Sequence, residues 1–142
     1  SLRNLSLLKN NIRKIEGLEK LTNLTQLILA ENQIVKIEGV SNLISLKNLS
    51  LYNNAISNIE GLQNLTQLRT LELFGNQIEM LSGLQNLVNL RELFIYNNPV
   101  KYVSKPTYQL LKDNKVRIYT DYDSYTTIDN YIKISNLTIE NE

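Results

Sequence analysis

The chain has 142 residues, enough for one domain of ordinary size. Its 42% hydrophobic and 20% charged residues predict a packed core, and a net charge of +1 gives no electrostatic basis for binding nucleic acid or an anionic membrane. Cysteine and histidine are absent, which excludes disulfides, a thiolate nucleophile, a Ser-His-Asp triad and the usual Cys/His zinc site. We therefore expect no enzyme activity, no metal and no cofactor. No apolar run is long enough to span a membrane.

A repeat of 22 residues accounts for most of the chain. Its units begin at Leu2, Leu24, Leu46, Leu68 and Leu90 and share the pattern L-x-x-L-x-L/I-x-x-N. Repetition at one fixed period indicates a stacked solenoid, because a single unit cannot bury its apolar face alone. The pattern resembles the leucine-rich repeat. The resemblance implies an α/β fold, a right-handed solenoid with a parallel sheet on the concave face, short 3₁₀ or extended turns on the convex face and a C-terminal cap.

Each position of the repeat has a predicted role. The leucines of the L-x-L strands, such as Leu49 and Leu51, point to one face and build the core. The asparagine that ends each pattern lies where the chain turns inward, and its amide suits buried backbone groups that the turn leaves unpaired. We expect these asparagines to stack as a structural ladder of Asn10, Asn32, Asn54, Asn76 and Asn98.

Further motifs point to a subclass of this family. The segments K-I-E-G-L, N-x-I-x-x-I-E-G and N-L-x-x-L resemble Sds22-like repeats, and Glu16, Glu38 and Glu60 before the glycines favour that subclass over the internalins. The resemblance implies either a phosphatase regulatory subunit or, more distantly, an internalin-like surface adhesin. The adhesin reading requires an export signal and an N-terminal cap, neither of which is found in this sequence.

The repeat register ends near residue 100. We expect repeats over 1–100, a cap over 101–120 and a tail over 121–142. The cap is predicted to hold a short helix from Lys105 to Asp113 and a closing strand from Val116 to Tyr119. The resemblance implies an aspartate after the last strand, either Asp121 or Asp123. In the tail, the alternation in 132–134 and 137–139 predicts one or two short strands, with a flexible segment as the alternative.

The outward positions of the strands define the candidate binding site. In stacked repeats Tyr52, Phe74 and Tyr96 fall in one column, so we expect a stacked aromatic strip on the concave face. Exposed aromatic groups of this kind are typical of partner-binding surfaces. The alternatives are stacking that only stabilises the sheet, and a tail that covers the strip. The predicted partner-binding residues are Tyr52, Phe74, Tyr96, Phe94, Glu72, Glu92 and Ile28.

The predicted function is non-enzymatic protein binding through the concave face. Glu72 and Glu92 are close enough to be considered as a catalytic carboxylate pair, but an open sheet does not desolvate an acid, so we interpret them as charges that select a partner. No nucleic-acid partner is expected, and we expect a cytoplasmic or nuclear location. Strand one has a free edge, which predicts either further repeats upstream or association through that edge.

Overall fold

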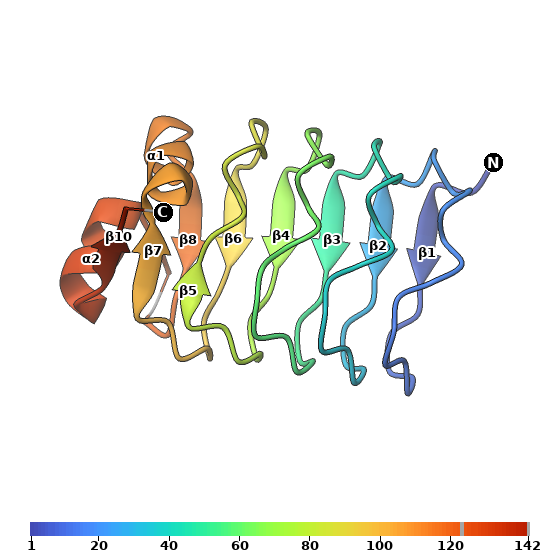
Figure 1. Ribbon diagram of the computed structural model, residues 1–142, viewed down its shortest axis with the longest axis horizontal. Helices are drawn as coiled ribbons and strands as arrows, with labels where there is room; N and C mark the ends of the chain where they lie inside the picture. The colour runs from blue at the N-terminus through green and yellow to red at the C-terminus, as the bar shows by residue number, and fades with distance from the viewer. Residues whose placement is uncertain (123, 142) are drawn as a thin grey trace.

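A computed structural model describes residues 1–122 and 124–141, and it shows a solenoid in which each repeat forms one coil (Figure 1). One seven-stranded sheet runs the length of the molecule in the order β1-β2-β3-β4-β6-β8-β9, and all neighbours are parallel except β8 and β9. Its strands are β1 (Asn4–Ser6), β2 (Gln26–Ile28), β3 (Asn48–Ser50), β4 (Thr70–Glu72), β6 (Glu92–Phe94), β8 (Arg117–Tyr119) and β9 (Tyr125–Thr126).

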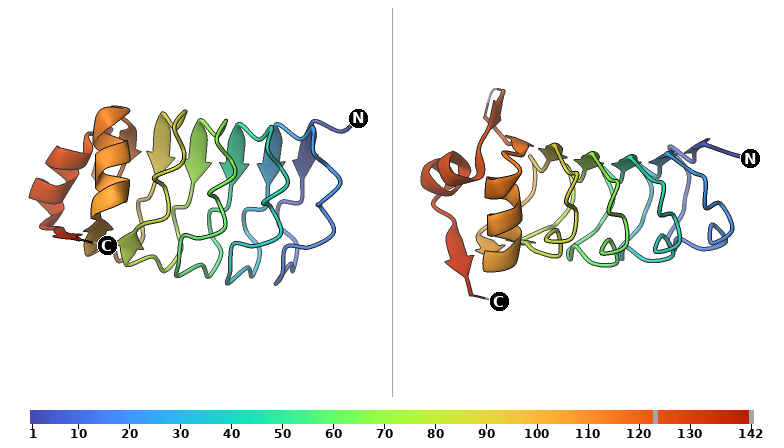
Figure 2. Two further views of the ribbon diagram at one scale, coloured as in Figure 1. Left: turned by 45° about the horizontal axis from the view of Figure 1, so that its top comes forward. Right: turned by 90° about the horizontal axis from the view of Figure 1, so that it is seen from above.

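A second sheet of three short parallel strands lies on the other side of the coils, near the C-terminal end (Figure 2). Its order is β10-β7-β5, so the last strand of the chain pairs with β7, which in turn pairs with β5 on the convex side. The strands are β5 (Met80–Leu81), β7 (Tyr102–Ser104) and β10 (Thr138–Glu140).

The core follows directly from the repeat. The central leucines of successive strands are paired in register, and Leu27, Leu49, Leu71 and Leu93 are all buried. Turns with i to i+3 hydrogen bonds connect the coils: the Leu21 N–H donates to the Leu18 carbonyl at 2.9 Å, and the bond recurs one repeat later from Leu43 to Val40 at 3.0 Å. These are single 3₁₀-type turns, as the short connecting segments predict.

The last coil is closed by helix α1 (Lys105–Asp113), as the sequence predicts. Pro106 lies in its first turn, and Leu110 and Leu111 are buried against the core. The Asp121 carboxylate accepts a hydrogen bond from the Asn97 N–H at 2.6 Å, so Asp121 lies where the resemblance implies the terminal aspartate. The alternative, Asp123, lies outside the described residues.

The tail contains a helix that the sequence analysis did not predict. Helix α2 (Ile128–Ser135) includes residues 132–134, so the expected strand there is wrong. Ile128 and Tyr131, one helical turn apart, are both buried, and Thr127 caps the helix by accepting a hydrogen bond from the Asn130 N–H at 3.3 Å. The other expected strand, over 137–139, corresponds to β10 with its bounds one residue later.

Helix α2 is attached to the cap. The Tyr108 hydroxyl donates to the Asp129 carboxylate at 2.7 Å, and the Lys112 ammonium lies 3.6 Å from the same carboxylate. Helix α2 packs mainly against α1 and β8. Among the described residues the tail therefore packs on the end of the solenoid and not over the aromatic strip.

The opposite end of the molecule is more open. In the described chain β1 pairs with β2 alone, and Leu7 and Ile12 beside it are only partly buried. These two side chains line an open hollow with Ile15, Leu18 and Leu29. Neither α1 nor α2 is long and apolar enough to cross a membrane, and the rest of the described chain contains no other helix.

Candidate functional site

The long sheet arranges the outward side chains in columns, one residue from each repeat. Asn48, Thr70 and Glu92 are register partners in one column, and Ser50, Glu72 and Phe94 are partners in the next. Ile28 belongs to the second column through its pairing with Ser50 and is half-buried. Ile28, Glu72, Glu92 and Phe94, the predicted residues from three separate strands, therefore lie on one face.

The stacked aromatic strip is present as predicted. The ring centroids of Tyr52 and Phe74 are 4.4 Å apart, and those of Phe74 and Tyr96 are also 4.4 Å apart, with interplanar angles of 9° and 10°. Each residue comes two positions after its strand, where the backbone still pairs between repeats: the Asn53 N–H donates to the Phe74 carbonyl at 2.9 Å. All three side chains are half-buried, so their edges remain open to a partner.

A second aromatic stack lies beside the first. The rings of Phe94 and Tyr119 are 4.1 Å apart and almost parallel, at 2°, and Tyr125 leans against Tyr119 at 5.9 Å. Sequence reasoning missed Tyr119 and Tyr125 as members of this face because the period of 22 ends before them. The alternation of Val116-Arg117-Ile118-Tyr119 was the available signal, since it directs Tyr119 to the same face as Phe94 once β8 is placed beside β6.

The two carboxylates of the face have different partners. Glu72 accepts a hydrogen bond from the Ser50 hydroxyl at 2.8 Å. Glu92 accepts one from the Tyr119 hydroxyl at 2.9 Å and lies 3.5 Å from the Arg117 guanidinium. Glu92 is thus largely neutralised by the cap, whereas Glu72 keeps its charge at the centre of the face.

Local charge and burial also act on the tyrosines. Partial burial, followed by the charges of Glu31 and Glu72, raises the pKa of Tyr52 above its ordinary value, and burial with the charge of Glu72 does the same for the pKa of Tyr96. The hydrogen bond to Glu92 is the main cause of the raised pKa of Tyr119. All three hydroxyls are therefore neutral near pH 7. Those of Tyr52 and Tyr96 can donate a hydrogen bond to a partner, whereas that of Tyr119 already donates to Glu92.

The asparagine ladder connects the backbones of adjacent coils where the chain leaves each strand. The Asn76 side-chain oxygen accepts from the Ile56 N–H at 3.0 Å, and its amide donates to the carbonyls of Leu51 and Leu73 at 3.1 and 2.9 Å. Asn32, Asn54 and Asn98 repeat this arrangement. Asn10 differs: it is exposed, and its amide donates only within its own turn, to Leu7 and Leu8.

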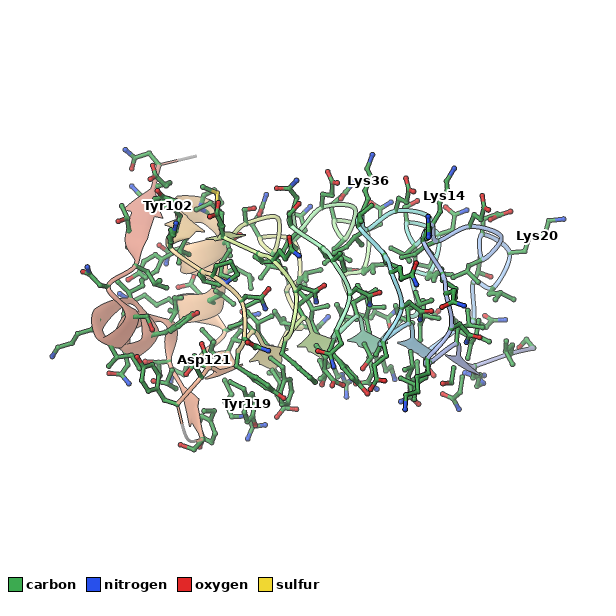
Figure 3. All side chains as sticks on the ribbon, turned by 90° about the horizontal axis from the view of Figure 1, so that it is seen from below. Lys14, Lys20, Lys36, Tyr102, Tyr119 and Asp121 are labelled. Atoms are coloured by element: carbon green, nitrogen blue, oxygen red, sulfur yellow. The ribbon has the colours of Figure 1, made fainter. Side chains whose placement is uncertain are left out.

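The charged side chains of the convex surface lie on the far side of the molecule from this face. In Figure 3 Tyr119 and Asp121 lie beside the sheet, and Lys14, Lys36 and Tyr102 lie on the opposite side. Within residues 1–122 and 124–141, no group of three His, Cys, Asp or Glu side chains is placed to hold a metal ion.

A model of the leucine-rich repeat family, described as "Leucine Rich repeats (2 copies)", matches four overlapping segments at residues 1–43, 22–65, 44–86 and 66–106. The chain belongs to the leucine-rich repeat family. The architecture is accordingly a right-handed leucine-rich-repeat solenoid with a C-terminal cap. No curated protein matches the sequence.

Solved leucine-rich-repeat structures resemble the chain in both sequence and fold. Internalin C2 from Listeria monocytogenes is 31% identical with a TM-score of 0.73, and the match covers 84% of this chain and 51% of that one. A leucine-rich-repeat protein from Leptospira interrogans is 34% identical with a TM-score of 0.72, covering 84% of this chain and 31% of that one. A second Listeria internalin is 26% identical with a TM-score of 0.57, covering 99% and 48%. The chain thus spans about half or less of these structures. None of them tests the Sds22-like assignment, which stays a prediction.

Proposed function

We propose that this protein is a non-enzymatic interaction module that binds a partner protein through the concave face of its sheet. The stacked strip of Tyr52, Phe74 and Tyr96 is the centre of the proposed site, flanked by Phe94, Glu72, Glu92 and Ile28. The observation that carries the proposal is that three aromatic rings, half-buried and in contact with one another, lie on the open side of the sheet.

The aromatic rings of the strip are pre-organised for binding. Each ring is held on a backbone that pairs with the next repeat, so little side-chain freedom is lost when a partner binds. Tyrosine is enriched among the residues that contribute most to binding energy, because it offers apolar area and a hydroxyl together. Glu72 is hydrogen-bonded to Ser50, whereas Glu92 forms an ion pair with Arg117, so the two carboxylates do not act as one acid–base pair. We therefore propose that they help to select the partner protein by charge.

A second candidate is an internalin-like surface adhesin. The similarity to two Listeria internalins favours it, and for this candidate too we propose binding through the concave face. The phosphatase-regulator alternative rests on the sequence resemblance alone, and the cytoplasmic or nuclear location stays a prediction.

The experiment is a comparison of matched aromatic variants. The immobilised protein is used to capture a partner, which is identified, purified and titrated by calorimetry. The triple variant Tyr52→Ala/Phe74→Ala/Tyr96→Ala is expected to weaken the interaction by about 30-fold or more, which corresponds to roughly 2 kcal/mol. The control, Tyr102→Ala, removes an exposed ring from the opposite side and should change the affinity by less than about two-fold.

Circular dichroism spectra and the free energies of unfolding of both variants separate binding from folding. An affinity that falls equally in the triple variant and in Tyr102→Ala would contradict the proposal. So would full affinity in a folded triple variant, which would leave the strip with the role of stabilising the sheet.

A further inference from the structure

A column of basic side chains runs along one border of the concave face. Lys47, Arg69 and Arg91 each immediately precede a strand, β3, β4 and β6 respectively. Their backbones are in register, because the Arg69 N–H donates to the Lys47 carbonyl at 2.8 Å and the Arg91 N–H donates to the Arg69 carbonyl at 2.9 Å. Neighbouring strands lie about 4.8 Å apart, so three cations leave the sheet border at that spacing. We name these three residues the basic rim.

No carboxylate of the described chain neutralises the positive charges of the basic rim. Arg69 and Arg91 are exposed, Lys47 is half-buried, and none of the three forms an ion pair with a carboxylate of the described chain. Arg91 donates instead to the carbonyl of Leu90 at 3.0 Å. Arg117 does not belong to this column: it is the register partner of Glu92 in β6 and forms an ion pair with that carboxylate. Like charges on adjacent strands repel each other, and an anionic ligand relieves that repulsion.

We propose that the basic rim binds an acidic segment of the partner polypeptide. This inference rests on the proposed function, since it specifies the chemistry of a partner on the same face. Lys47 and Tyr52 lie on either side of β3, five residues apart in the sequence and therefore at most roughly 16 Å apart along the chain. A single interface of ordinary size covers both the rim and the aromatic strip. The guanidinium groups of Arg69 and Arg91 suit carboxylates because each can donate two parallel hydrogen bonds.

The charges of the face favour a polypeptide over a nucleic acid. Glu72 keeps its negative charge in the middle of the face, and Asp121 adds another at the cap end. A nucleic acid carries phosphates along its whole length, and these would be repelled by both carboxylates as soon as it extended beyond the rim. The net charge of +1 also gives no long-range attraction for a polyanion. A protein surface can place carboxylates at the rim and apolar groups at the strip.

The test uses a defined anionic probe and charge-matched variants. A fluorescein-labelled peptide of about four glutamates, short enough to contact the rim alone, is titrated with the protein at low ionic strength and again at about 0.15 M salt, followed by anisotropy. The rim variant is Arg69→Glu/Arg91→Glu. The control is Lys14→Glu/Lys36→Glu, which changes the net charge equally on the opposite side of the molecule (Figure 3). Circular dichroism verifies that each variant is folded.

We expect the rim variant to lose at least about ten-fold in peptide affinity and the control less than about two-fold, with binding of the wild type weakened by salt. Equal losses in the two variants would overturn the inference, because net charge alone would then explain binding. Tighter binding of a single-stranded oligonucleotide of the same charge would overturn it in favour of a nucleic acid. A dimer of the wild type that the rim variant abolishes would overturn it in favour of a second copy.

The triple variant Tyr52→Ala/Phe74→Ala/Tyr96→Ala separates this inference from the proposed function. It keeps the basic rim and should bind oligo-glutamate as the wild type does. Failure of the rim variant to affect the peptide contradicts only the acidic-partner inference. Retention of the captured partner by the triple variant contradicts only the role of the strip.

Discussion

The rings of Phe94 and Tyr119 lie face to face, 4.1 Å apart and 2° from parallel, although one belongs to the last repeat and the other to the cap. Strand β8 continues the register of the repeats, since Phe94 pairs with Tyr119 and Glu92 with Arg117. The Tyr119 hydroxyl also donates to Glu92 at 2.9 Å. The cap therefore extends the concave face as well as closing the core.

The asparagine ladder gives a prediction with an internal control. Asn76→Ala leaves the Ile56 N–H and the carbonyls of Leu51 and Leu73 without their side-chain partner, and we expect it to lower the free energy of unfolding by about 1–3 kcal/mol. Asn10→Ala should have an effect below about 0.5 kcal/mol, because Asn10 is exposed and water replaces its bonds. Urea denaturation of the two variants measures the difference. An equal decrease in the free energy of unfolding in both variants would show that the contribution of a ladder asparagine to stability does not depend on its burial.

Two glycines with the same backbone conformation give a second matched pair. Gly17 and Gly61 have φ angles of +79° and +73°, so alanine is strained at either position. A Cβ at Gly61 would lie 2.7 Å from the Ile37 carbonyl oxygen of the preceding coil, whereas one at Gly17 meets nothing. We expect Gly61→Ala to be more destabilising than Gly17→Ala by at least about 1 kcal/mol, measured by thermal or urea unfolding. A smaller cost for Gly61→Ala than for Gly17→Ala would mean that the coils are not stacked this closely.

The aromatic strip predicts an order of stabilities. Phe74 is stacked on both sides, whereas Tyr52 is stacked on Phe74 alone among the pairs of the strip. A stacked pair contributes about 0.5–1.5 kcal/mol beyond burial, so Phe74→Ala should cost about that much more than Tyr52→Ala. Chemical denaturation of the two single variants tests this order. If Tyr52→Ala were the more costly change, the three rings would not be stacked with Phe74 between the tyrosines.

The buried tyrosine of α2 predicts sensitivity to alkali. Burial is the main cause that raises the pKa of Tyr131 well above its ordinary value of 10.0. Because the hydroxyl holds its proton more tightly in the folded than in the unfolded chain, its contribution to stability is complete below about pH 10 and decreases as the pH rises further. Unfolding midpoints measured from pH 8 to 12 should fall at the alkaline end, and less steeply in Tyr131→Phe. An identical pH dependence of the unfolding midpoint in the wild type and in Tyr131→Phe would mean that the Tyr131 hydroxyl is exposed to water.

The solenoid and its aromatic strip could be predicted from the sequence because a fixed period gives every residue a fixed place. Once Leu49 and Leu71 are aligned at a spacing of 22, Tyr52 and Phe74 must be neighbours on the outer side of the strand ends. The asparagine bonds follow from the same spacing, since they connect equivalent turns of adjacent coils.

The cap and tail were predicted less completely because the period ends there. The alternation of Ile132, Lys133 and Ile134 suggests a strand. However, Ile128 and Tyr131 lie one helical turn apart and are both buried, and this burial favours the helix α2. Thr127 as N-cap was the overlooked helix signal. The pairing of β10 with β7 depends on where the end of α2 directs the chain, and two such distant segments carry no shared sequence pattern.

The most direct test of partner binding at the aromatic strip is hydroxyl-radical footprinting of the protein alone and with its captured partner, because aromatic side chains are reactive and no mutation is needed. We expect oxidation of Tyr52, Phe74 and Tyr96 to fall in the complex, while oxidation of Tyr102, on the opposite side, stays unchanged. Protection of Tyr102 with no change at the three rings of the strip would contradict binding through the concave face.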